Sequence, residues 1–160
     1  MGEEGLRAIM AARRKTAVAS ILFIVCALPV TAQDEPVRVL EGVYQEDVAY
    51  RVGDQLEPRV EVDGVRWLEV SVAPRDGEEL TADQDARVEV RLSFDNRERR
   101  GATLIVVLLL EDEEGGQLHR LSLPEMRLGG NRAKEYDHKE QVPGQALLDT
   151  RRMYLFFRVQ

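Results

Sequence analysis

The chain has 160 residues, of which 29 are acidic and 22 are basic, so its formal net charge is −7 at pH 7. A negative field of this kind repels nucleic acids and anionic lipid headgroups, and we expect neither as a partner. The chain has one cysteine, Cys26, so an intrachain disulfide is excluded.

Residues 1–32 have the three-part pattern of a secretory signal peptide. A basic cluster precedes an uncharged apolar stretch, residues 16–30, and Val30 and Ala32 are the small residues that typically precede a cleavage site. The apolar stretch is shorter than the ~20 residues that a membrane-spanning helix usually needs. We therefore predict export to the periplasm or the extracellular space, with processing between Ala32 and Gln33. An uncleaved membrane anchor is the alternative.

Removal of the leader would leave 128 residues, which is enough for one domain with a real core. It would also remove Cys26, four basic residues and two acidic ones, leaving 18 basic and 27 acidic residues and a net charge of −9. Packing alone would then stabilise the mature chain, with no stable membrane insertion. We expect an extended lead-in over residues 33–45 and a β-sandwich domain over residues 46–160.

Short β-type runs separated by turn residues make up the rest of the chain, without a long helical pattern. In the first pair of runs, Asp63–Gly64 is a dipeptide that favours a two-residue hairpin turn. Trp67 follows on the second arm, and we expect it to fill the core because aromatic side chains mainly contribute buried area. If Leu68 and Val70 face inward, Trp67 faces the other way. Either a β-bulge re-aims the strand or both of its faces are covered.

The later runs differ in their apolar pattern. Residues 87–94 alternate between apolar and polar side chains, which predicts a strand with one buried face. Residues 103–110 have no polar face, which favours a central strand covered on both sides. Residues 132–142 predict an exposed polar strand, and residues 143–150 have room for one helical turn. Residues 153–160 predict a final strand that is apolar on both faces. Such a strand is central, covered, or a docking edge for another chain.

These runs predict an all-β fold, an immunoglobulin-like antiparallel β-sandwich of about seven or eight strands, preceded by the signal-peptide helix. Residues 91–118 contain an apolar strand that ends in Phe94-x-Asn96, then a polar loop, a longer apolar strand, and a turn with Asp112 and Gly115. This pattern resembles bacterial extracytoplasmic immunoglobulin-like or fibronectin-III-like modules. The resemblance implies a fold class, and it brings no catalytic or ligand-binding residue.

The residues suited to catalysis or zinc binding do not form a motif. The two histidines, His119 and His138, are well separated, whereas a zinc site usually needs three or four ligands. Ser71, Ser93 and Ser122 lie in alternating strands, without the G-x-S-x-G turn that exposes a nucleophile. We therefore predict no catalytic residue, no metal ligand and no cofactor.

Two acidic stretches, residues 82–86 and 111–116, have side chains that attract calcium, but neither has the ligand spacing of an EF-hand loop. We interpret both as solvated turns. A hydrolase could use a pair of the many carboxylates, but an acid with a raised pKa needs a pocket. The sequence marks no such pocket.

The function that we expect is that of a secreted, non-enzymatic binding or assembly module of the bacterial cell envelope. It would offer its loops or a sheet edge to another protein of the envelope or the extracellular space. The alternative is a structural or accessory subunit of a larger surface assembly, tethered by an uncleaved leader. A small periplasmic hydrolase is the third class. The sequence specifies neither the partner nor the oligomeric state.

Overall fold

The computed structural model describes residues 35–39, 42–75 and 79–160. The predicted signal peptide, residues 1–32, and its processing site between Ala32 and Gln33 lie outside these ranges. Within the described ranges, the structure contains no helix with the length and apolar character needed to cross a membrane.

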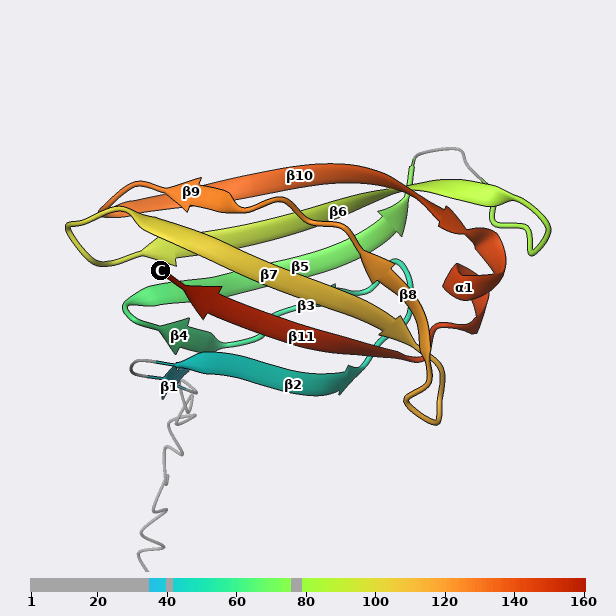
Figure 1. The fold of residues 1–160 in the computed structure, drawn as a ribbon, viewed down its shortest axis with the longest axis horizontal. Coiled ribbons are helices and arrows are strands. Elements are labelled where there is room, and N and C mark those ends of the chain that lie inside the picture. The colour runs from blue at the N-terminus through green and yellow to red at the C-terminus, as the bar shows by residue number, and fades with distance from the viewer. Residues whose placement is uncertain (1–34, 40–41, 76–78) are drawn as a thin grey trace, which may run out of the picture. The chain divides into compact units, whose positions relative to one another are not determined.

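Strands account for most of the described residues, and they form two sheets (Figure 1). Sheet A contains β1 (Val37–Val39), β3 (Gln55–Leu56), β4 (Val60–Val62), β5 (Val65–Pro74), β6 (Asp85–Asn96) and β10 (Arg132–Pro143). Sheet B contains β2 (Val43–Ala49), β7 (Ala102–Glu111), β8 (Gln117–Leu121), β9 (Met126–Leu128) and β11 (Arg152–Val159). A short helix, α1 (Gly144–Asp149), connects β10 to β11 and confirms the predicted helical turn. The all-β prediction is likewise confirmed.

The strand order places β5 and β6 in the middle of sheet A, and β11 and β7 in the middle of sheet B (Figure 1). The order of sheet A is β1–β4–β5–β6–β10, with β3 beside β5, and the order of sheet B is β2–β11–β7–β8, with β9 also beside β7. All pairs are antiparallel except β1 with β4. The final strand is therefore central, which is one of the three positions that its two apolar faces predict.

The described residues form eleven strand segments, more than the seven or eight predicted. Two prolines interrupt strands of the two sheets. Pro58 separates β3 from β4, and Pro124 separates β8 from β9. Proline has no N–H to donate to a neighbouring strand, so each proline divides one run into two segments. The predicted lead-in, residues 33–45, also contains β1 and the first residues of β2.

The β4–β5 hairpin turns at the predicted dipeptide. Asp63 and Gly64 have φ angles of 47° and 79°, which is the pair of positive values that a type I′ turn requires. Further along β5, a bulge shifts the register between Trp67 and Glu69. Leu68 is consequently 41% exposed, whereas Trp67 is 1% exposed. The bulge alternative is confirmed, and Trp67 lies in the core as predicted.

The core lies between the inner faces of the two sheets. The predicted alternation is present in β6, whose inward side chains are Val88, Val90, Leu92 and Phe94. The ring centroids of Trp67 and Phe94, both in sheet A, lie 5.5 and 5.3 Å from that of Phe157 in sheet B. Aromatic pairs at such distances bury large areas and attract one another. This cluster therefore joins the two sheets.

Strand β7 is central in sheet B, but only one of its faces is fully buried. Its inward residues are Leu104, Val106, Leu108 and Leu110, all buried. The residues between them, Ile105, Val107 and Leu109, are half-buried. The prediction of cover on both faces is wrong, because sheet B is one layer of a two-sheet structure and its second face points outward.

Candidate binding surface on sheet B

The outer face of sheet B carries a group of half-buried apolar side chains, which we call the apolar stripe. It consists of Ile105, Val107 and Leu109 on β7 and Tyr154 and Phe156 on β11. The register places Val107 opposite Phe156, and Leu109 opposite Tyr154, so the two strands contribute to one continuous surface (Figure 1). The outer face of an antiparallel sheet is commonly polar. Apolar side chains that stay partly accessible in that position are a candidate contact surface for another molecule.

Exposed arginines border the apolar stripe. They are Arg120 on β8, Arg127 on β9 and Arg158 on β11, and we call them the rim arginines. In the register they stand opposite Leu109, Thr103 and Ile105, respectively. Within the part of the chain that the structure describes, no rim arginine forms an ion pair. Three uncompensated positive charges therefore lie beside an apolar surface in a chain of net charge −7.

A carboxyl pair lies at one end of the same outer face. Glu111 on β7 is 8% exposed, and its carboxyl group lies beside that of Asp47 on β2. Burial raises the pKa of Glu111, the charge and hydrogen bond of Asp47 raise it further, and Arg152 opposes the shift. Arg152 Nη2 lies 3.9 Å from Asp47 Oδ2, and its Nε atom is buried without a hydrogen-bond partner.

A concavity lies beside Arg152 at this end of sheet B. Its lining residues are Ala49, Tyr50, Arg51, Asp54, Glu113, Arg151 and Arg152. Neither Asp47 nor Glu111 lines it, although a catalytic acid must reach the substrate from the wall of its pocket. The raised pKa of Glu111 therefore belongs to a contact within sheet B.

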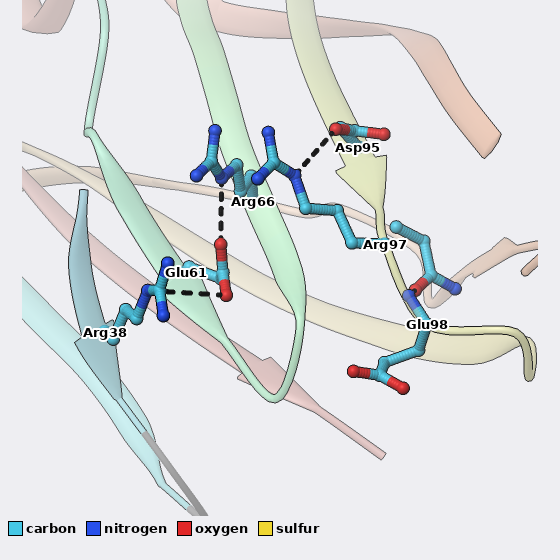
Figure 2. Close-up of polar contacts among 7 residues, drawn as sticks. Arg38, Glu61, Arg66, Asp95, Arg97 and Glu98 are labelled. Carbon is cyan, nitrogen blue, oxygen red and sulfur yellow. Dashed lines mark hydrogen bonds and ion pairs between the residues drawn. The ribbon is translucent and has the colours of Figure 1, made fainter. Parts of the chain in front are cut away.

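The outer face of sheet A has a different character. Arg38, Glu61, Arg66 and Asp95 occupy one cross-strand row over β1, β4, β5 and β6, with alternating charges. Figure 2 shows the resulting contacts. Arg66 Nε lies 2.8 Å from Glu61 Oε2, and Arg38 Nε lies 3.9 Å from Glu61 Oε1. Arg97 Nε lies 3.4 Å from Asp95 Oδ2. Opposite charges in neighbouring strands compensate one another, so this face is a solvated, charge-balanced surface.

The two histidines, predicted to have no role as ligands, come together around Glu140. His119 Nε2 lies 3.4 Å from Glu140 Oε1, and His138 Nε2 lies 3.8 Å from Oε2. The backbone N–H of Ser122 donates to Oε2 at 2.8 Å. These contacts join β8, at the edge of sheet B, to β10, at the edge of sheet A. Inward-pointing polar groups at sheet edges are a common protection against unwanted strand pairing.

No group of three or more histidine, cysteine, aspartate or glutamate residues is arranged to hold a metal ion within the described ranges. The serines lie elsewhere. Ser71 is in β5, Ser93 is in β6, and Ser122 follows β8. Among the described residues, no hydrogen bond joins a hydroxyl of these serines to an imidazole. The structure therefore does not bring the predicted candidates together as a triad.

The residues that carry the resemblance have structural roles. Phe94 lies in the aromatic cluster, and Asn96 is 1% exposed. The Asn96 side chain donates to two backbone carbonyls and accepts one backbone N–H, which fixes the loop after β6. Asp112 Oδ1 accepts two backbone N–H groups within its own turn, where Gly115 has a φ of 86°. A carboxylate that satisfies its own turn in this way explains the acidic stretch without a bound cation.

No protein-family model and no curated protein matches the chain. Among solved structures, it is similar to the enzymatically active domain of tailspike protein 4 from bacteriophage CBA120, with 14% sequence identity and a TM-score of 0.22. The aligned region covers 75% of this chain and 17% of that one. At this TM-score the similarity supports neither a shared fold nor a shared function.

Proposed function

We propose that the chain is a non-enzymatic binding module of the bacterial cell envelope that docks a partner protein on the outer face of sheet B. The observation that carries this proposal is the apolar stripe. Its five side chains lie on the two central strands of the sheet, each of which pairs with a strand on both sides. Contact surfaces on proteins are typically apolar at their centre, with aromatic side chains and arginine enriched.

The proposal includes export by the leader and cleavage after Ala32, which rest on the sequence pattern of residues 1–32. The runner-up is a structural or accessory subunit of a larger surface assembly that retains its leader as a tether. The intact mass of the purified chain distinguishes the two, since a cleaved chain begins at Gln33.

The finer fold class is also a proposal. An immunoglobulin-like sandwich is supported by two features: β1 and β2 lie in different sheets, and the chain crosses between sheets from β6 to β7 and from β10 to β11. The run β4–β5–β6 places three consecutive strands side by side in one sheet. The constant-type immunoglobulin order has no such run. We therefore propose an immunoglobulin-like sandwich with its own strand order.

The test uses the tagged full-length gene, expressed in the cells where the protein occurs and purified gently from the envelope fraction. Three forms are compared: the wild type, the stripe variant Val107→Thr with Phe156→Thr, and a control with Arg91→Thr and Ser93→Thr on the outer face of sheet A. Threonine is used throughout because it retains strand propensity. Thermal melting checks that all three forms fold.

The expected result is one protein in fixed stoichiometry that elutes with the wild type and with the control, and that the stripe variant loses. Elution of the wild type alone would contradict the proposal. So would a co-eluting protein that all three forms retain, because binding would then involve another surface. Native mass spectrometry measures the stoichiometry and the N-terminal residue in the same experiment.

A further inference from the structure

The rim arginines indicate what the partner of this surface presents. We infer that the outer face of sheet B binds a protein segment whose apolar centre is flanked by carboxylates. The inference rests on the binding function proposed above and adds the chemical class of the partner.

Each rim arginine lies close to the apolar stripe. Arg120 stands opposite Leu109, and Arg158 opposite Ile105, in directly paired positions of neighbouring strands. Side chains in such positions have Cβ atoms about 4.5–5.5 Å apart. Arg127 lies on β9, beside the first residues of β7. A partner that covers the apolar stripe must therefore also contact these guanidinium groups or remove their water.

Removing water from a charged group is unfavourable unless the partner supplies an opposite charge. Arg152 on the same face already contacts Asp47, and Arg66 and Arg91 on sheet A already contact carboxylates. The rim arginines have no such compensation within the described ranges. Guanidinium groups bind carboxylates through two parallel hydrogen bonds, so carboxylates are the complement that suits them best.

A protein segment fits this surface better than a polyanion does. Nucleic acids, acidic polysaccharides and anionic membranes carry charge along their whole length, and the net charge of −7 repels them at long range. They would also leave the apolar stripe without an apolar counterpart. A protein segment with aliphatic or aromatic side chains between acidic ones complements both the stripe and its rim.

The experiment selects binders for the purified full-length chain from a displayed library of random peptides of about 12 residues, at low salt. The strongest binder is then synthesised and titrated against four forms. These are the wild type, the stripe variant, the rim variant (R120Q, R127Q and R158Q), and a charge-matched control (R91Q, R97Q and K139Q) that loses the same number of positive charges outside the stripe. Circular dichroism and melting temperature confirm that each form is folded.

The expected peptides combine apolar residues with flanking aspartate or glutamate. The rim variant should bind them about tenfold more weakly, since ion pairs on an exposed rim are weakened by water and each contributes only a small part of the affinity. The control should bind as the wild type does, and affinity for the wild type should fall as salt is added.

Other outcomes would overturn the inference in distinguishable ways. The carboxylate partner is refuted if the selected peptides lose affinity for the stripe variant but contain no excess of acidic residues. It is also refuted if they bind the rim variant as tightly as the wild type. In both cases the proposed function still stands. Peptides that bind the stripe variant unchanged, or a library without binders, contradict both proposals. Heparin or phosphatidylglycerol vesicles that bind the wild type and not the rim variant, without acidic peptides, would identify a polyanion instead.

Discussion

The two outward faces of the sandwich differ in how their charged side chains are compensated. On sheet A, Arg38, Glu61, Arg66 and Asp95 form a row of alternating charges across four strands, and Arg91 contacts Asp137 at 3.3 Å. On sheet B, apolar side chains occupy the centre, and the rim arginines have no ion pair within the described ranges. Most arginines on the outer face of sheet A contact a carboxylate of the chain, whereas the rim arginines of sheet B have none within the described ranges.

This difference is the reason for proposing the outer face of sheet B as the contact surface. A charge-balanced face in water has little to gain from a partner, since it would have to give up its hydration. An apolar face bordered by unpaired guanidinium groups binds a partner favourably for two reasons: apolar area is buried, and new ion pairs form. The location of the proposed binding surface therefore follows from the contrast between the two faces.

The largest expected effect separates the outer face of sheet B from the core. Phe157 is fully buried in the aromatic cluster, whereas its neighbour Phe156 is half-buried on the outer face. We expect Phe157→Ala to lower the free energy of unfolding by about 3–5 kcal/mol, because it leaves a cavity in the core. Phe156→Ala should cost about 1 kcal/mol, the centre of the range for point substitutions, because its ring is half-buried and its removal leaves no enclosed cavity. Urea denaturation of both variants measures the difference, and equal losses would show that the apolar stripe is part of the core.

The second prediction concerns the charge row on sheet A. Glu61→Gln removes the carboxylate that both Arg38 and Arg66 contact, and the Glu61 side chain is only 15% exposed. We expect a loss of about 1–2 kcal/mol, since hydrogen bonds to charged groups contribute more than exposed ion pairs do. Added salt should weaken the coupling between Glu61 and Arg38, whose side chain is 63% exposed, more than the coupling between Glu61 and Arg66. Double-mutant cycles with Arg38→Gln and Arg66→Gln measure both couplings, and the absence of any coupling would contradict the compensation described here.

The third prediction uses the pH dependence of Glu111 at the end of the outer face of sheet B. Its pKa is raised in the folded state, chiefly by burial, so the folded chain holds this proton to higher pH than the unfolded chain does. The stability linked to this group is present below the ordinary carboxyl range and is lost as pH rises through the raised pKa. Glu111→Gln should flatten that decline, because a neutral amide replaces the protonated acid. Urea midpoints between pH 3 and pH 8 test this, with Glu113→Gln as the exposed control. Parallel curves for wild type and Glu111→Gln would refute it.

Local features of the fold were predictable from sequence, whereas the sites that depend on sheet order were not. The turn at Asp63–Gly64 and the alternation of residues 87–94 need only neighbouring residues, so the sequence predicts them correctly. The apolar pattern of residues 103–110 predicts cover on both faces, and the half-buried outer face differs because an apolar sequence pattern does not say how much of each side chain neighbouring strands cover. The contact of His119 with Glu140, like that of Asp47 with Glu111, depends on which distant strands lie side by side, and no local pattern encodes that.

The smallest expected effect on stability is that of the rim arginines, and it sharpens the contrast with sheet A. Their side chains have no ion pair within the described ranges, so the rim variant should change the free energy of unfolding by less than about 0.5 kcal/mol per substitution. Arginines that contact carboxylates on sheet A should each cost more. Urea denaturation of the rim variant and of Arg66→Gln, at the same salt concentration, measures both effects. A rim variant that loses as much stability per substitution as Arg66→Gln does would mean that these guanidinium groups already serve the fold. A rim variant as stable as the wild type leaves their three charges free for a partner, because nothing in the sandwich itself then requires them.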